Sequence, residues 1–499
     1  MKTVKRPREI SPEHLNITLS PNGPAVFVQI REQIRSLIAQ GHLAPGMRLP
    51  AIRTLAKQLG VNQITVARAY RQLGEGGIIE GRHGGGTYVA SPTSLIETTS
   101  ASEPSKRSDP LLAERLFELA HAPGVISFSA NYPHLDAKRI SNFRECLTQA
   151  INLKLDSCLL YEPPTGRPSL QLQIGKYLAS QGIDIDPHTV VVTSGAQQAI
   201  DLTVKALVSP NTPVIVERPA YYGAINAFQG AGARILEVPL QDDGMDLEIL
   251  EALLSRHRAK VIYTNPTFQN PTGITMSEAK RHALLALARR FNATILEDDH
   301  SSDLRFRGLP LPSIRALAKP EDPVCHVRGF GKIALPGFRM GFLVAPNSVR
   351  QKVLKLKAHA DLHCNALIQE ALAIYMEKDH FKRSTAWMKT YYGERQQRLY
   401  DSLLAEMPKG TEIIRPDGGL SLWLTLPGDA FVSELYFRAV RRGVAFVPGE
   451  VFFASSPNHR SLRISFGLNR DDELQDGVSR LCSVVNDLTN RPNRGMVLI

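Results

Sequence analysis

The feature that most constrains the fold of this chain is an alternation of short apolar runs with longer helical patterns after about residue 111. The runs are rich in β-branched residues, which favour strands. They lie at residues 190–193, 214–216, 234–238, 261–263, 294–296, 324–327 and 342–344. Strands that alternate with helices form a mainly parallel sheet covered by helices. Such sheets bind ligands at the carboxyl ends of their strands, so the polar residues after each strand define the candidate site.

Polar or glycine-containing segments follow several of these strands in turn. Gly195 and Ala196 open a long helix after the first strand, and free backbone N–H groups at a helix start form a cradle for an anion. Tyr221 follows the second strand and carries a ring that can cover a flat ligand. Asn270 follows a later strand with an amide that can donate to a phenolic oxygen. Asp298 ends another, and its carboxylate can hold a ring nitrogen protonated.

Lys332 follows the predicted strand at residues 324–327, and Arg339 comes seven residues later. Each feature has an ordinary alternative, because loop lysines are usually solvated, Asn-Pro-Thr-Gly is a common kind of turn, and Asp298 can cap a helix. An anion cradle, an aromatic plate, an amide, a carboxylate and an amine in this order nevertheless describe a pyridoxal phosphate pocket. In such a pocket the lysine forms a Schiff base and the acid keeps the pyridinium electron-withdrawing.

A smaller, basic segment precedes the alternating region. Residues 1–90 hold twelve Lys and Arg against five Asp and Glu, a net charge of +7 out of +11 for the whole chain, which points to a polyanionic partner. Apolar spacing predicts a helix over residues 25–40, a second from Leu49-Pro50 to Gly60 and a third from Asn62. Short helices joined by a tight turn at Leu59-Gly60-Val61 are the helix-turn-helix pattern.

Residues 78–89 contain three consecutive glycines between two β-prone segments, which predicts a hairpin, or wing. The glycines let the backbone approach phosphates closely, and Arg82 and His83 add donors. The competing interpretation is the glycine-rich phosphate loop of a nucleotide enzyme. We set it aside because no long helix follows the glycines and no Gly-Lys-Ser or Gly-Lys-Thr sequence is present there.

Residues 25–90 closely resemble the winged-helix domain of the GntR regulator family through Leu49-Pro50-Ala-Ile-Arg53, Leu59-Gly60-Val61 and the segment from Gly81 to Val89. The resemblance implies double-stranded DNA as a partner, with the third helix in the major groove. The positions that we expect at the DNA are Arg53, Gln63, Thr65, Arg68, His83 and Gly84. The family commonly has Ser-Arg where Asn62-Gln63 stands here. Because glutamine pairs with adenine whereas arginine prefers guanine, we expect a different operator preference.

Residues 115–490 resemble the fold-type I aminotransferases, in the form found in MocR-type GntR regulators. The resemblance implies that Lys332 binds pyridoxal 5'-phosphate covalently and that Asp298 pairs with its ring nitrogen. It also implies that Asn270 meets the ring hydroxyl and that Tyr221 stacks on the ring. The residues implied at the phosphate are Gly195, Ala196 and Arg339.

The same resemblance implies an assembly and an effector site. Tyr161 matches a tyrosine that reaches the phosphate of the neighbouring subunit, so we expect a homodimer, swapped head to tail, with each linker crossing to the partner. Arg463 matches the arginine that clamps an amino-acid carboxylate through two parallel N–H bonds. The effector is then a small amino acid, an amine or a B6 vitamer.

Two positions depart from the aminotransferase pattern. His300 stands where a tyrosine usually donates to the ring hydroxyl, and a histidine ordinarily titrates near neutrality. Gly329 stands where a serine or threonine usually contacts the phosphate, so one phosphate ligand is missing. These departures favour cofactor binding over full transaminase turnover.

The expected architecture is α/β in class. An N-terminal arm at residues 1–24 precedes the winged helix-turn-helix at 25–90, and a linker rich in Ser, Thr and Pro spans 91–114. The fold-type I domain at 115–490 has a mainly parallel sheet and a smaller C-terminal α+β subdomain, with a tail at 491–499. We expect a cytoplasmic protein without a membrane span or metal site, because no long apolar run, secretory signal or CxxC is present.

Three functions remain open from the sequence. The leading hypothesis is a transcription regulator that senses pyridoxal phosphate or an amine or amino acid that reacts with it. The second is a working aminotransferase whose DNA-binding domain is incidental or autoregulatory. The third is a regulator that has lost the cofactor and uses the aminotransferase fold for dimerisation.

Overall fold

The computed structural model describes residues 15, 17–20, 25–39, 43, 46–75, 79–82, 86–89, 118, 120, 122–428, 432–455 and 458–489. The chain divides into two compact units, Met1–Asp109 with Phe117–Val125, and Pro110–Leu116 with Ile126–Ile499. The predicted linker at 91–114, the tail at 491–499, most of the arm at 1–24, and the wing residues His83 and Gly84 lie outside the described residues.

The smaller unit is a winged helix-turn-helix, as predicted. It contains α1 (Val26–Ala39), α2 (Ile52–Leu59), α3 (Gln63–Glu75), and an antiparallel pair of strands, β1 (Ile79–Arg82) and β2 (Gly86–Val89). The turn between α2 and α3 forms at Gly60, whose φ of +64° suits a residue without a side chain. Ile30, Ile34, Leu55 and Val66 are among the fully buried residues that hold the helices together.

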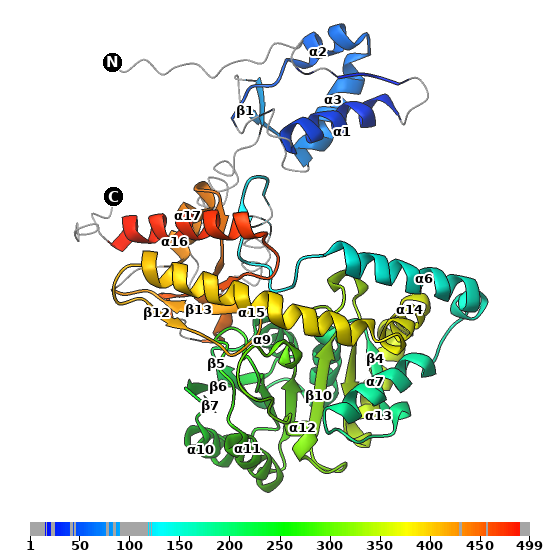
Figure 1. Ribbon diagram of the computed structural model, residues 1–499, viewed down its shortest axis with the longest axis vertical. Coiled ribbons are helices and arrows are strands. Elements are labelled where there is room, and N and C mark those ends of the chain that lie inside the picture. Colours follow the sequence, from blue (N-terminus) through cyan, green and yellow to red (C-terminus); the bar gives the residue numbers. More distant parts are fainter. Residues whose placement is uncertain are drawn as a thin grey trace. The chain divides into compact units, whose positions relative to one another are not determined.

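The larger unit is built on a mixed, mainly parallel sheet (Figure 1). Its strand order is β4-β11-β10-β9-β8-β5-β6-β7. The strands are β4 (Val191–Thr193), β5 (Pro213–Arg218), β6 (Arg234–Gln241), β7 (Gly244–Met245), β8 (Val261–Thr264), β9 (Thr294–Asp298), β10 (Val324–Gly329) and β11 (Gly341–Val344). All the strands expected from the apolar runs form here. The strands β10, β9, β8, β5 and β6 run parallel, whereas β11 is antiparallel to both β4 and β10.

Helices cover both faces of this sheet. On one face lie α8 (Ala196–Leu207), α9 (Tyr222–Gly230) and α13 (Asn347–Ala360), and on the other α10 (Leu247–His257), α11 (Glu278–Phe291) and α12 (Ile314–Leu317). A third core joins α6 (Ala137–Cys158), α7 (Pro168–Ser180) and α14 (Ala366–Glu377) to the β4–β11 end. The strands are buried on both faces, which explains their continuous apolar runs.

A smaller α+β subdomain follows the long helix α15 (His380–Glu406). It has a four-stranded antiparallel sheet in the order β12 (Glu412–Ile414), β13 (Ser421–Thr425), β16 (Ser461–Ser465) and β15 (Val447–Pro448). The helices α16 (Val432–Arg441) and α17 (Asp471–Thr489) belong to it, and β14 (Val444–Ala445) pairs with β3 (Ile126–Ser127). The segment after β3 therefore lies beside the C-terminal subdomain.

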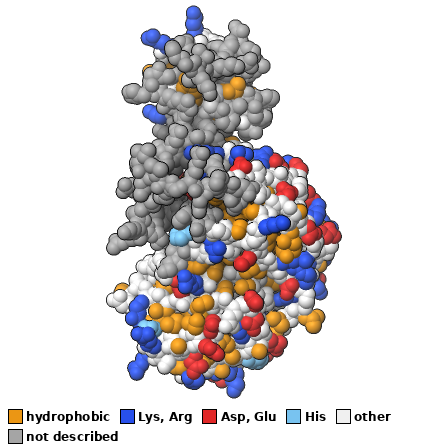
Figure 2. All heavy atoms as spheres, turned by 90° about the vertical axis from the view of Figure 1, so that its left-hand side faces the viewer, with side chains coloured by type: hydrophobic (Ala, Val, Ile, Leu, Met, Phe, Trp, Pro, Cys, Tyr) orange, Lys and Arg blue, Asp and Glu red, His pale blue; other side chains and the backbone are white. Residues whose placement is uncertain are grey.

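The surface of the larger unit carries no extended field of one sign in the view that Figure 2 displays, because acidic and basic side chains intermingle there. No helix within the described part of the chain is both long enough and apolar enough to cross a membrane.

Candidate functional site

The predicted cofactor residues meet at the carboxyl edge of the sheet. Asp298 is the last residue of β9, and its register partner on β10 is Val327, five residues before Lys332. Asn270 follows β8, Tyr221 follows β5, and Gly195 follows β4. Parallel strands bring their carboxyl ends to one edge, which is the physical reason that residues so far apart in the chain converge.

Lys332 has the electrostatic character of a reactive amine. Loss of hydration lowers the pKa of its ammonium to about 7, an effect that the nearby Asp298 carboxylate opposes and the Arg463 guanidinium reinforces. Near neutral pH a large fraction of the side chain is therefore the neutral amine, which is the nucleophilic form. An ordinary solvated loop lysine would remain almost fully protonated at that pH.

Asp298 presents one unsatisfied oxygen. Its side chain is 3% exposed, and Oδ2 accepts a hydrogen bond from the hydroxyl of Tyr263 at 2.8 Å. Its Oδ1 is buried and has no hydrogen-bond partner among the described residues, and burial raises the pKa of the carboxyl group. Because buried polar atoms are nearly always paired, this oxygen marks where a ligand donor fits. A protonated ring nitrogen is such a donor.

Several other buried polar atoms also have no hydrogen-bond partner among the residues that the structure describes. They include Nδ1 of His300, Oε1 of Gln197 and Nε of Arg463. The pKa of His300 is lowered well below the ordinary value for histidine. Burial is the main cause, and the positive charge of Lys332 is the second. His300 is therefore a neutral imidazole near pH 7, rather than a group that titrates there. A polar ligand with several acceptors and donors would satisfy these atoms together.

The start of α8 lies in a close-packed cradle of three glycines, Gly195, Gly329 and Gly341, and Arg339. Gly195 has a φ of +92°, and a Cβ there would lie 2.9 Å from Nη2 of Arg339. A Cβ on Gly341 would lie 2.9 Å from the amide nitrogen of Ala196, and one on Gly329 3.4 Å from the same atom. These glycines let β10, β11 and the Arg339 guanidinium close around the free N–H groups of the first turn, where phosphates bind.

Hydrogen bonds behind the cradle hold its loop in place. The backbone N–H of Ser194 donates to Oε1 of Gln198 at 2.7 Å, and Nε2 of Gln198 donates to Asp361 at 2.7 Å. The fully buried Lys357 donates to the same carboxylate at 2.7 Å. These hydrogen bonds link two segments that lie far apart in the chain, residues 194–198 and 357–361, and the two share no sequence motif that would have revealed the contact.

Asn270 and Arg463 are joined directly. Nη1 of Arg463 donates to Oδ1 of Asn270 at 2.9 Å, and Nη2 donates to the backbone oxygen of Ser129 at 2.9 Å. The Asn270 amide nitrogen is thereby directed away from Arg463 as a donor for a ligand oxygen. Arg463 is 3% exposed and lies 5.1 Å from the centre of the Phe452 ring, and burial lowers its pKa. Its Nε donates to no atom of the described residues, so the guanidinium retains donor capacity.

Tyr221 and Tyr161 differ in their positions. The Tyr221 ring lies beside that of Tyr222, with centres 5.0 Å apart, and burial raises the pKa of the Tyr221 hydroxyl. A Cβ on Gly223 would lie 2.6 Å from the Tyr221 ring, so this glycine makes room for it. Tyr161 is 85% exposed and contacts the ring of His363 edge-on, with centres 5.9 Å apart.

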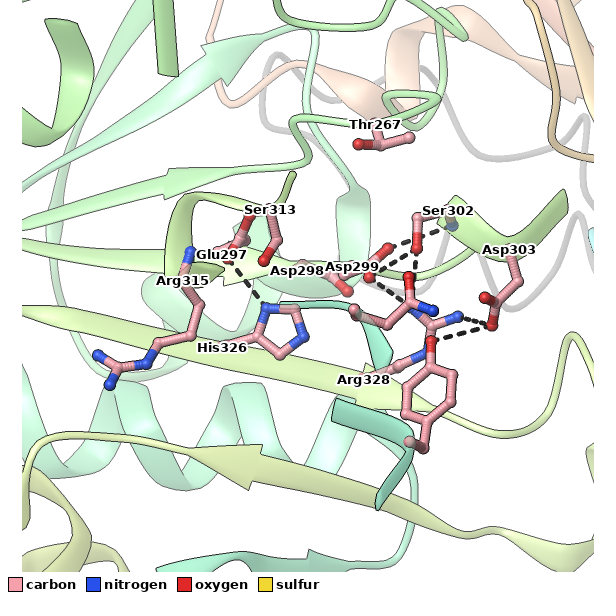
Figure 3. A network of polar contacts seen from close by, with 12 residues as sticks. Thr267, Glu297, Asp298, Asp299, Ser302, Asp303, Ser313, Arg315, His326 and Arg328 are labelled. Carbon is pink, nitrogen blue, oxygen red and sulfur yellow. Dashed lines mark hydrogen bonds and ion pairs between the residues drawn. The ribbon is translucent and has the colours of Figure 1, made fainter. Parts of the chain in front are cut away.

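The residues on either side of Asp298 in the chain, Glu297 and Asp299, each take part in an ion-pair network (Figure 3). Glu297 accepts hydrogen bonds from the amides of Ile314 and Arg315 and contacts Nδ1 of His326 at 2.9 Å. In the second network the buried Arg328 donates to Asp299 and Asp303 and, at 2.9 Å, to Oγ of Ser302. Although burial acts to raise it, Arg328 and His326 hold the pKa of Asp299 below the ordinary value. Sequence reasoning missed these residues, whose pairings are all long-range.

The predicted DNA-facing residues that the structure describes lie on α2 and α3. Arg53, Gln63 and Arg68 are exposed and Thr65 is partly exposed. The guanidinium of Arg68 lies 4.1 Å from the centre of the Phe27 ring, a stacking contact that orients it. Ile64, on the same helix as Gln63, is 75% exposed.

A basic side chain also lies beside the wing. Arg48 forms an isolated bridge with Tyr88 of β2, and a Cβ on Gly86 would lie 2.8 Å from its Nε. Arg48 thus lies beside the hairpin, although it precedes Tyr88 by 40 residues in the chain. The net positive charge of this unit could have indicated that a basic side chain lies near the wing, but not that it is Arg48.

Comparison with known proteins agrees with this geometry. Residues 123–481 match the family described as aminotransferase class I and II, and residues 27–89 match the bacterial regulatory proteins of the gntR family. The HTH-type transcriptional regulator YdcR of Escherichia coli is 30% identical over 92% of this chain and 99% of its own. The probable rhizopine catabolism regulatory protein MocR of Rhizobium meliloti is 30% identical over 91% of this chain and 92% of its own.

Among solved structures, the α-aminoadipate aminotransferase LysN of Thermus thermophilus has a TM-score of 0.71 and 30% identity, covering 79% of this chain and 99% of its own. That structure contains N-(5'-phosphopyridoxyl)-L-leucine. The family depends on pyridoxal phosphate, and the unpaired Asp298 oxygen, the glycine cradle and the Lys332 amine all fit this cofactor. The chain therefore belongs to the aminotransferase class I and II family and carries an N-terminal GntR-type helix-turn-helix domain, in the manner of the MocR regulators.

Proposed function

We propose that this protein is a DNA-binding transcription regulator that binds pyridoxal phosphate at Lys332 and responds to an amino acid or amine bound beside it. The observation that carries the proposal is the pairing of a lysine whose pKa is lowered to about 7 with a buried Asp298 oxygen that has no hydrogen-bond partner in the described part of the chain. A purely structural lysine and aspartate would instead satisfy one another or solvent.

When bound, pyridoxal phosphate supplies a carbonyl carbon for the lysine and an electron-withdrawing ring. The residues of this chain hold it in defined ways. Oδ1 of Asp298 would accept a hydrogen bond from the protonated ring nitrogen, and the Asn270 amide would donate one to the ring hydroxyl. The start of α8 and Arg339 bind the phosphate. Tyr221 covers one face of the ring and keeps water from it.

The effector site is centred on Arg463. The Arg463 guanidinium donates to Asn270 and to the backbone oxygen of Ser129, each at 2.9 Å. A bound carboxylate would compete with these two acceptors for the guanidinium. Because Asn270 also faces the cofactor ring, effector binding alters the environment of the ring through one shared side chain. An amine that took the place of Lys332 on the cofactor would free the lysine, and this would shift the conformational equilibrium that governs how the DNA-binding domain is presented.

The assembly that this proposal requires is a homodimer. Tyr161 is 85% exposed and lies among exposed apolar residues, which include Leu159, at 73%, and Leu160, at 69%. Exposed apolar side chains that follow one another along the chain in this way are typical of an interface. In the dimer, the Tyr161 hydroxyl of one subunit binds the phosphate in the other. Light scattering should give a dimer mass, and Tyr161→Phe should weaken cofactor retention without changing that mass.

The decisive experiment is borohydride reduction of the purified protein followed by peptide mass spectrometry. We expect a visible absorption band from the cofactor and a phosphopyridoxyl group on the peptide that contains Lys332. Lys332→Ala should lose both, whereas Lys355→Ala, which changes an exposed lysine on α13, should keep both. Retention of the band by Lys332→Ala would refute the site assignment.

DNA binding tests the regulatory half of the proposal. A gel-shift titration should give an affinity that changes when pyridoxal phosphate and candidate amino acids or amines are added, and Lys332→Ala should remove this response. An affinity for DNA that is indifferent to every added compound would contradict the sensing role.

A working aminotransferase is the second candidate, because the lysine, the aspartate and the carboxylate-binding arginine are all present at one site. Mixing the protein with an amino acid separates the two. A single conversion of the bound cofactor, without sustained turnover when a keto acid is added, supports the regulator. Continuous turnover supports the enzyme. A protein that stays colourless after incubation with pyridoxal phosphate would support a cofactor-free regulator instead.

A further inference from the structure

Tyr263, a core residue of β8, donates a hydrogen bond to one oxygen of the Asp298 carboxylate, and the other oxygen faces the candidate cofactor site. Its side chain is fully buried, and its hydroxyl lies 2.8 Å from Oδ2 of Asp298 and 3.4 Å from Oδ1 of Asn265. Nδ2 of Asn265 donates to the backbone oxygen of Asp298 at 2.7 Å. The carboxylate is thus held from behind on one oxygen, while Oδ1 has no partner among the described residues.

The sheet register explains how Tyr263 reaches this carboxylate. Tyr263 pairs with Leu296 on the neighbouring parallel strand β9, so both side chains project from the same face of the sheet. Asp298 lies two residues beyond Leu296 and therefore returns to that face. The phenol ring spans the difference of two residues and brings its hydroxyl to the end of the strand. A residue as short as serine at this position would not reach it.

The surroundings of the ring show that the hydroxyl is not needed for packing. Tyr263 belongs to an apolar core cluster with Val216, Phe228 and Leu296, and its ring meets that of Phe228 edge-on with centres 6.3 Å apart. A phenylalanine would fill the same space among these side chains. The polar atom of this residue is therefore placed for its contact with Asp298, and burial together with that carboxylate raises the pKa of the phenol well above its ordinary value.

We propose that Tyr263 is a positioning residue that orients the Asp298 carboxylate and tunes its interaction with the cofactor ring nitrogen. The inference rests on the proposed binding of pyridoxal phosphate at Lys332. The Tyr263 hydroxyl donates to Oδ2 and fixes the rotation of the carboxylate, so that Oδ1 points at the ring. By fixing this rotation, it sets how strongly Asp298 holds the ring nitrogen protonated.

Tyr263→Phe is the test, because it deletes one oxygen and leaves the apolar contacts intact. Loss of this hydrogen bond to a charged group should weaken cofactor binding roughly tenfold. Equilibrium dialysis of the full-length protein would measure the change. The midpoint pH of the absorbance change of the bound cofactor should rise by about one unit. The rise follows because, without the Tyr263 contact, Asp298 would hold the positive charge on the ring nitrogen less firmly. A ring that carries less positive charge would depress the pKa of the Schiff-base nitrogen less.

Tyr375→Phe is the matched control. Tyr375 is also buried, at 2% exposure, but it lies on α14 in the core cluster of α6 and α7. Both variants should lower the melting temperature of the cofactor-free protein by similar amounts, whereas only Tyr263→Phe should move the absorbance midpoint. Equal midpoints for the two variants and the parent protein would overturn the inference. If the parent protein itself showed no cofactor band, the proposed function would fail instead, so the two failures are distinguishable.

Discussion

Replacement of Lys332 by methionine should stabilise the protein without its cofactor. Loss of hydration lowers the pKa of Lys332 from 10.5 to about 7. The unfolded chain therefore binds a proton that the folded chain does not, over the whole range between these two values. Stability that depends on this group increases with pH across that window, because the unfolded state holds more protons. Methionine has a similar length, carries no charge and escapes the penalty.

The magnitude follows from the two pKa values. At pH 6 nearly the whole difference between the two pKa values lowers the free energy of unfolding. It corresponds to about 5 kcal/mol at 1.36 kcal/mol for each unit of pKa. At pH 9 the unfolded lysine is still mostly protonated but the folded one is neutral, and the cost is about 2 kcal/mol. Because part of the Lys332 side chain keeps contact with solvent, both figures are upper limits.

Urea denaturation followed by tryptophan fluorescence is the assay. The two tryptophans of the chain, Trp387 and Trp423, both lie in the larger unit, so their emission reports the unfolding of that unit. We expect Lys332→Met to raise the denaturation midpoint strongly at pH 6 and less at pH 9, both measured after removal of the cofactor. A stabilisation of equal size at the two pH values, or a loss of stability, would refute the reasoning about Lys332.

Three further substitutions test the cradle and the DNA-binding helix. Gly341→Ala should cost roughly 2 kcal/mol or more in urea denaturation, because its Cβ would lie 2.7 to 2.9 Å from backbone atoms, whereas Gly337→Ala, with nothing within 4 Å, should be neutral. Gly329→Ser should lower the dissociation constant for pyridoxal phosphate severalfold by adding a hydroxyl beside Ala196; weaker binding would show that the 3.3 Å contact leaves too little room. Gln63→Arg should shift the selected operator from adenine toward guanine at one position by about 1–3 kcal/mol, which binding-site selection would detect, and an unchanged operator would place Gln63 away from the bases.

The sequence by itself determined the elements of this protein and the order of its site residues. The β-branched runs became the central strands, and Gly60 forms the turn between the two helices of the DNA-binding unit. Lys332 and Asp298 could be recognised because Lys332 lies three residues after β10 and Asp298 ends β9. Parallel strands present their carboxyl ends at one edge, so local periodicity was enough to predict that these residues would meet.

Only the tertiary structure decided which atoms face one another. The antiparallel insertion of β11 between β4 and β10 closes Gly341 on the start of α8, and no local pattern specifies that strand order. The bond from Arg463 to Asn270 joins residues 193 positions apart. The low pKa of His300 arises from burial, which the neighbouring sequence does not reveal. The Tyr263 contact with Asp298 depends on the register of two strands, which long-range packing sets.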